Sequence, residues 1–191
     1  MKLARLAVAA LAVACQKAMP PAQQSNATPG PAPGTPEWKI QNAMSAAPAA
    51  IVAGATIMDW PATPGGQMTQ LRAGTNGWTC LPDMPSTAMN DPICADQTTM
   101  EWFGSFMGKK TPAIRQVGFS YMLQGGEASN TDPSAEKPDS TNHWVRVGPH
   151  AMVVVPSVTT LAGYSADPGS GGPWVMWKGT PYAHVMVPTK P

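Results

Sequence analysis

Two short stretches decide how this chain folds: His150-Ala151-Met152-Val153-Val154-Val155-Pro156 and His184-Val185-Met186-Val187-Pro188. In both, His and Met stand two positions apart, and Ala or Val occupies the positions between and after them. Since side chains alternate between the two faces of a strand, each stretch is predicted to be a strand with His and Met on one face. The opposite face is uniformly apolar, so we expect it to face the core.

The His and Met side chains of these strands form a candidate metal site. If the strands pair antiparallel, His150 can lie opposite Met186 and Met152 opposite His184, and His143, the remaining histidine, can join them. Imidazole and thioether together suit copper, above all Cu(I). The alternative is a sheet face covered by a helix, with hydrogen-bonded histidines and packed methionines. Because the His-x-Met motif is short, packing is the stronger expectation.

The composition narrows the class of protein. The chain has 191 residues, of which 12% are charged, and its formal net charge is +1. It lacks the basic surface of a nucleic-acid-binding protein, so we expect no nucleic-acid partner. Its 18 glycines and 22 prolines favour a loop-rich fold. Leucines are few, and the 13 methionines and 7 tryptophans must supply much of the core.

The N-terminal segment resembles an export signal. Residues 1–14 combine Lys2 and Arg5 with an apolar run too short to span a bilayer. The small residues before Cys15 predict a lipoprotein that is anchored to the membrane of the bacterial envelope through Cys15; a secreted or periplasmic protein without an anchor is the alternative. The Pro-rich residues 15–36 are expected to form a disordered tether, and residues 37–191 a single globular domain.

With Cys15 assigned to the lipid, Cys80 and Cys94 remain as a pair. In an oxidising compartment we expect them to form a disulfide that closes a loop of about 15 residues. The loop contains three prolines and would be poorly structured without a crosslink. Because the spacing is not Cys-x-x-Cys, a structural role is favoured over a redox role.

The remaining pattern predicts an α+β fold with a largely antiparallel sheet and two main helices. Helices are expected from Thr35-Pro36 to Ala47, from Asn90-Asp91-Pro92 to Met107 with an inward stripe of Ile93, Met100, Phe103 and Met107, and briefly near 157–162. Strands are expected at 55–60, 68–72, 78–81, 117–123, 144–147, 150–155, 174–177 and 182–187. Asn76-Gly77 predicts a hairpin between 68–72 and 78–81, the last two strands are expected to form another, and 127–141 is expected to be a surface loop.

A second candidate site is aromatic. Trp144, Trp174, Trp177 and Tyr182 cluster in sequence, and exposed rings on a sheet can stack on sugars or peptides. Trp174 and Trp177 are three apart, so they point to opposite faces of a regular strand unless a bulge intervenes. The common catalytic motifs are absent, and no catalytic residue is assigned.

Two stretches resemble exported bacterial proteins, lipoproteins of unknown function: Leu71-Arg72-Ala73-Gly74-Thr75-Asn76-Gly77-Trp78-Thr79-Cys80-Leu81-Pro82 and Gly172-Pro173-Trp174-Val175-Met176-Trp177-Lys178-Gly179-Thr180-Pro181-Tyr182-Ala183-His184. The resemblance covers most of the chain from Glu37 onward. It supports a location in the bacterial cell envelope or periplasm and implies no activity, cofactor or catalytic residue.

The sequence therefore leads to three functional hypotheses. The first is a non-enzymatic domain, anchored in the envelope, that binds a small molecule, a glycan or an envelope protein. The second is a periplasmic protein that binds or buffers copper through the two His-x-Met motifs. The third is an enzyme of unrecognised type, which would need convergent polar groups, such as His143, His150 and an acid, around one cavity.

Overall fold

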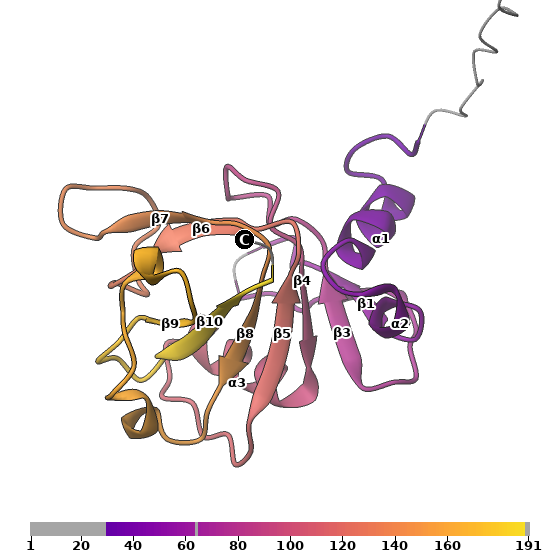
Figure 1. Ribbon diagram of the computed structural model, residues 1–191. Coiled ribbons are helices and arrows are strands. Elements are labelled where there is room, and N and C mark those ends of the chain that lie inside the picture. Colours follow the sequence, from indigo (N-terminus) through magenta and orange to yellow (C-terminus); the bar gives the residue numbers. More distant parts are fainter. Residues whose placement is uncertain (1–29, 64, 190–191) are drawn as a thin grey trace, which may run out of the picture.

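A large, mostly antiparallel sheet forms the centre of the molecule in the computed structural model, which describes residues 30–63 and 65–189 (Figure 1). Its eight strands are β2 (Thr69–Arg72), β1 (Thr56–Asp59), β3 (Trp78–Leu81), β4 (Ile93–Asp96), β5 (Gly118–Met122), β8 (His150–Val154), β10 (His184–Pro188) and β9 (Trp174–Met176), in that spatial order. Strands β6 (Gly126–Ser129) and β7 (Trp144–Val147) form a separate ribbon. The helices are α1 (Pro36–Met44), α2 (Ala49–Val52) and α3 (Gln97–Met107), with 3-10 turns at Val158–Leu161 and Pro168–Ser170. The predicted α+β class is confirmed.

The N-terminal predictions fall on residues that the structure does not describe. The signal peptide of residues 1–14, Cys15 and the tether up to residue 29 all lie outside the described ranges. Within those ranges, no helix is both long enough and apolar enough to cross a membrane.

The helices cover both faces of the sheet. Helices α1 and α2 pack on the face that carries Cys80, Cys94 and Tyr121, around a core of small residues. Helix α3 packs on the other face, to which Ser120 points because side chains alternate along β5. In Figure 1, α1 and α2 lie beside β1 and β3, α3 lies behind the sheet, and the β6–β7 ribbon crosses one end of the strands.

The first helix begins as the sequence predicts. Pro36 occupies its first turn, and the Thr35 hydroxyl accepts a hydrogen bond of 3.2 Å from the Trp38 amide. This cap satisfies one of the free N–H groups at the start of a helix.

The predicted hairpin between 68–72 and 78–81 is wrong. Strand β1 lies between them, antiparallel to β2 and parallel to β3. The connecting loop packs against the start of β1, because the Thr75 amide donates to the Gly54 carbonyl and a Cβ on Gly74 would lie 2.1 Å from the Thr56 nitrogen. Local turn chemistry at Asn76-Gly77 is therefore overridden by the insertion of β1.

The predicted start of the main helix is also wrong. Ile93 belongs to β4, where Cys94 pairs directly with Cys80, and α3 begins only after Asp96, whose carboxylate caps the Thr99 amide at 2.7 Å. The inward stripe of α3 is Thr99, Trp102, Phe103 and Phe106. Of the predicted stripe, Phe103 belongs to it, whereas Ile93 lies in β4 and Met107 is exposed.

The predicted surface loop 127–141 begins as a strand. Glu127 to Ser129 pair with β7, and the Glu127 carboxylate binds Arg146 at 3.1 Å across the ribbon. This strand is polar and lacks an apolar alternation, so the hydrophobic pattern gave no sign of it. The terminal hairpin of β9 and β10 is present as predicted.

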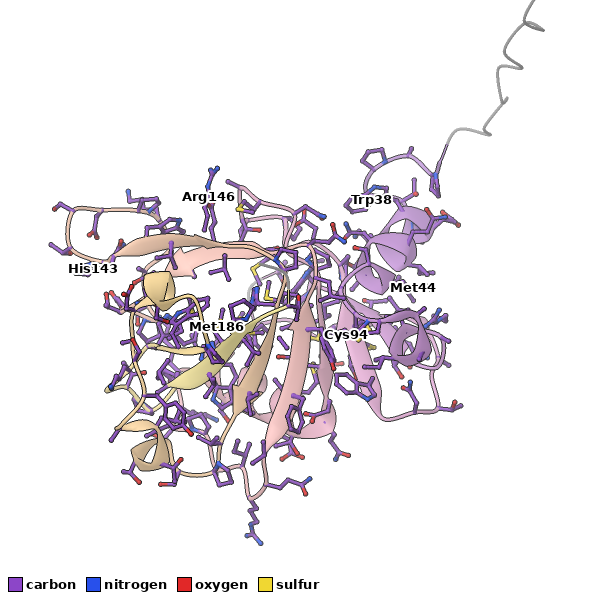
Figure 2. All side chains as sticks on the ribbon, in the orientation of Figure 1. Trp38, Met44, Cys94, His143, Arg146 and Met186 are labelled. Carbon is purple, nitrogen blue, oxygen red and sulfur yellow. A yellow bond between two sulfur atoms is a disulfide. The ribbon has the colours of Figure 1, made fainter. Side chains whose placement is uncertain are left out.

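The predicted disulfide between Cys80 and Cys94 is confirmed. The two residues face each other across β3 and β4 and are fully buried. Figure 2 shows Cys94 among the strands of the large sheet, and its side chain belongs to the core on which α1 and α2 pack. The crosslink joins the two ends of the Pro-rich loop 82–92, which forms part of the cavity described below.

The double variant Cys80→Ala, Cys94→Ala is expected to lose about 3 kcal/mol of unfolding free energy. Without the disulfide, the unfolded chain no longer contains a closed loop of about 15 residues, so its conformational entropy is higher. Urea denaturation measures the loss, and reduction of the wild type should give a similar value. Alkylation of both thiols in native, unreduced protein would contradict the prediction.

Gly118 lets α3 approach the sheet. A Cβ there would lie 2.6 Å from Thr99 Oγ1 and 2.8 Å from the Thr99 nitrogen. We expect Gly118→Ala to lower the unfolding free energy by roughly 1–3 kcal/mol. The matched control, Gly104→Ala on the open side of α3, has no atom within 4 Å of the new Cβ and should raise it by about 0.5–1 kcal/mol. Similar urea midpoints for the two variants would contradict this close packing.

Candidate functional site

A cavity of about 140 Å³ lies between the sheet and helix α3, and residues of the β6–β7 ribbon and of loop 82–92 form part of its lining. Its lining is rich in rings and thioethers. The aromatic residues are Trp60, Trp102, Phe103, Phe106 and Trp177; the methionines are Met84, Met122, Met152, Met176 and Met186; the polar residues are His150, His184, Asp91, Glu127, Thr99 and Ser120. All four His and Met residues predicted from the two strand motifs therefore line one cavity.

The register of these strands differs from the expected one. Strands β8 and β10 do pair antiparallel, but Met152 lies opposite Met186, and His150 lies opposite Pro188. The predicted pairs His150 with Met186 and Met152 with His184 are wrong by a shift of two residues. A shift of two keeps every side chain on its face, so the histidines and methionines still share one side of the sheet.

The side of the sheet that holds the core also differs from the prediction. The His and Met face carries the larger core, with Val154, Met186 and the rings of Trp102 and Trp174 buried in it. The alternate face of the same strands packs a smaller cluster around Leu161, and Phe119 on that face is 48% exposed. Both faces are apolar, which is why alternation alone did not identify the buried one.

One ring nitrogen of His150, which lines the cavity, has no hydrogen-bond partner. Its Nδ1 lies 2.8 Å from the Gly148 carbonyl, which can only accept, so Nδ1 carries the proton. The residue is 2% exposed, and its Nε2 has no hydrogen-bond partner. Burial lowers the pKa of His150, so the imidazole is neutral near pH 7 and Nε2 holds a lone pair.

His184 has the same local anchor but different surroundings. Its Nδ1 donates to the Tyr182 carbonyl at 2.9 Å, and burial lowers its pKa to about 4. Its ring lies edge-on to the indoles of Trp102 and Trp177, with centroids 5.3 Å and 5.0 Å away. This imidazole is thus packed among aromatic rings.

Each histidine has two methionines as near neighbours in the sheet. Met122 pairs directly with His150 across β5 and β8, and Met152 is two residues further along the same face. Likewise, Met176 pairs with His184 across β9 and β10, and Met186 is two residues further along. The sequence motifs contained only one methionine of each set, because Met122 and Met176 lie on strands without a histidine.

Three polar atoms of the cavity lack a hydrogen-bond partner: Thr99 Oγ1, Ser120 Oγ and His150 Nε2. Buried polar groups are almost always hydrogen-bonded, so such a concentration in one cavity marks a place where a ligand or water completes the bonding. Ser120 and His150 are not hydrogen-bonded to each other, although that contact is needed to activate a serine nucleophile. No sequence motif pointed to Thr99 or Ser120.

The carboxyl group of Asp91 is part of the cavity lining. Burial raises its pKa to about 6, although its Oδ1 accepts a hydrogen bond of 3.1 Å from the Met84 amide. Its own amide donates to Asp83 Oδ1 at 3.0 Å, so two aspartates hold loop 82–92 closed. The loop thereby brings Met84 and Asp91 to the cavity, which the sequence did not predict.

His143 is not part of this site. It lies on the exposed loop between β6 and β7 with a φ of +47°, and Figure 2 shows it at the outer end of the ribbon, away from Met186. The convergence of His143 with His150 that an enzyme was expected to show is absent from the described residues.

The predicted aromatic cluster is largely interior. Trp174 and Trp177 are 3% and 9% exposed, and their indole N–H groups donate to Asn130 and to the Ser129 carbonyl. A φ of +54° at Trp177 ends β9 and brings both rings into the same core, despite their spacing of three. Trp144 and Tyr182 are half-buried, so the four rings do not form an exposed platform.

Comparison of the chain with protein-family models, with curated proteins and with solved structures found no match.

The low pKa of His184 makes stability depend on pH. The unfolded histidine binds its proton near pH 6.5 and the folded one near pH 4, so folding becomes less favourable as pH falls through this range. At about 1.4 kcal/mol per pKa unit, we expect His184→Gln to remove on the order of 3 kcal/mol of the decrease between pH 7 and pH 4.

Urea denaturation of both proteins at several pH values measures this difference. Asp91 affects stability in the opposite direction. Because its pKa is raised to about 6 in the folded protein, its contribution to the unfolding free energy decreases as pH rises from about 4 to 6. Asp91 is present in both proteins, so its contribution cancels. Parallel pH profiles would show that His184 is not buried in neutral form.

Proposed function

We propose that this chain is an exported, envelope-anchored domain that binds one small ligand in the cavity between the sheet and α3. The observation that carries the proposal is the presence of three partnerless polar atoms in the lining of a single, largely apolar cavity. The N-terminal pattern of a basic start, a short apolar run and Cys15 supports an anchored location.

The size of the cavity limits the ligand. Sites for drug-sized molecules usually measure about 300–1,000 Å³, whereas an apolar cavity of about 150 Å³ holds benzene or xenon. At about 140 Å³, this cavity suits a single ion or a molecule of benzene size. A sugar chain or peptide is too large for it, and the buried indoles of Trp174 and Trp177 offer such ligands no stacking surface.

The charge of the lining limits the ligand further. Two carboxylates line the cavity, and no lysine or arginine is among the described residues that do so. Both imidazoles are neutral near pH 7 because burial lowers their pKa. An anion would find no positive partner, so the ligand is a neutral molecule or a cation.

The proposal is tested with xenon and benzene as probes, using the full chain labelled with ¹³C at the methionine methyl groups. Five of these methyl groups belong to the cavity wall, and the exposed Met107 serves as an internal reference. We expect saturable shifts of the cavity methyl signals while Met107 stays unchanged.

Ser120→Leu should abolish these shifts, because the larger side chain fills the cavity from β5. The control Val153→Leu places a larger side chain on the face of β8 that points away from the cavity, so it should leave the shifts intact. The proposal is wrong if neither probe shifts the wild-type signals, or if Ser120→Leu responds like the wild type.

A further inference from the structure

We propose that the ligand of the cavity is Cu(I), bound by His150 Nε2 and by the thioethers of Met122 and Met152. This inference rests on the proposed function, since it names the ligand class of the same cavity. The predicted copper site combined His150, Met152, His184, Met186 and His143. The proposed cluster keeps His150 and Met152, adds Met122 and leaves out the other three.

The imidazole of His150 is prepared as a metal ligand. Metal-binding histidines commonly donate the other ring N–H to a carbonyl, which fixes the tautomer and the ring orientation. His150 does so through Nδ1 and the Gly148 carbonyl, and the free Nε2 belongs to a side chain that is 2% exposed. A bound cation gives this buried lone pair the partner that the protein does not supply.

The two thioethers define the preferred metal. Met122 lies directly opposite His150, and Met152 follows it on the same face of β8, so both extend from neighbouring positions of one sheet surface. One imidazole and two thioethers form a soft set of donors that favours Cu(I). Zn²⁺ usually requires four donors from Cys, His and carboxylates, and no group of three such side chains occurs among residues 30–63 and 65–189.

The surroundings distinguish His150 from His184. Each histidine has one methionine opposite it on the neighbouring strand and a second methionine two positions further along its own strand. The ring of His184, however, is enclosed by Trp102 and Trp177. His150 instead lies on the part of the sheet next to β6 and loop 82–92. The imidazole of His150 therefore lies outside the aromatic enclosure that Trp102 and Trp177 form around His184.

A carboxylate near the first cluster can balance the charge of a monovalent cation. Met122 Cε and Asp91 Cβ lie 3.1 Å and 3.6 Å from the point where a side chain on Gly126 would begin. Asp91 is thus close to Met122, and Gly126 leaves the space between them open. The other carboxylate of the lining, Glu127, is paired with Arg146. Neutral ligands with one carboxylate free of a basic partner match a single positive charge better than a double one.

The test uses Cu(I) kept reduced with ascorbate, and Ag(I) without any reductant as a second soft cation. The protein is the full chain with Cys15→Ser, because a free thiol would also bind Cu(I). Thiol reductants are avoided so that the Cys80–Cys94 disulfide stays closed. We expect one ion per chain in competition with a chromogenic chelator, and X-ray absorption showing one nitrogen and two sulfur neighbours.

Two matched double variants locate the ion. Met122→Leu with Met152→Leu should weaken Cu(I) binding at least about tenfold, while Met176→Leu with Met186→Leu should leave it within about twofold. Leu and Met have similar volumes, so both variants should fold, and urea denaturation checks this. His150→Gln should also weaken binding, and His184→Gln should not.

Equal loss in the two methionine variants, unchanged binding in the first, or several ions bound per chain would overturn the proposal. Absence of Cu(I) and Ag(I) binding to the wild type would do so as well. If xenon or benzene still shifts the cavity methyl signals in that case, the metal is wrong but the binding cavity remains. If those probes fail too, the proposed function is wrong with it.

Discussion

A buried histidine held by the carbonyl two residues before it is the interaction on which the rest of this structure depends. It occurs twice, at the first residue of β8 and at the first residue of β10. An ionised imidazole in such an interior would be strongly unfavourable, so the hydrogen bond at Nδ1 and the burial together fix a neutral ring. The backbone before each strand must therefore place a carbonyl under the ring, and the core must close over Nε2.

Long-range connections then determine what closes over the two rings. Over His184, the core supplies indoles from α3 and from the end of β9. The end of the sheet near His150 receives shorter segments, namely β6 and the loop between the two disulfide-bonded cysteines. Two similar strand motifs thus have different environments, because different segments of the chain cover them.

The sequence predicted all described strands except β4 and β6, because short runs of β-branched, aromatic and other apolar residues between turn residues mark them locally. It did not predict the register of β8 and β10, since a shift of two residues leaves every side chain on the same face. Residues 155–183 connect these strands, so no tight turn fixes the pairing. The start of α3 was missed for a related reason: the pairing of Cys94 with Cys80 draws Ile93 and Cys94 into the sheet, against the local helix signal of Asn90-Asp91-Pro92.

The candidate site could be predicted only in part, because methionine serves equally as core filler and as soft ligand. The motifs identified His150 and Met152 through their spacing, but Met122 reaches them from a strand whose sequence contains no histidine. Asp91 reaches them from a loop whose path depends on the disulfide. The proposal that His150 is a ligand rests on its partnerless Nε2, and that property arises from the tertiary structure around the ring rather than from the motif that contains it.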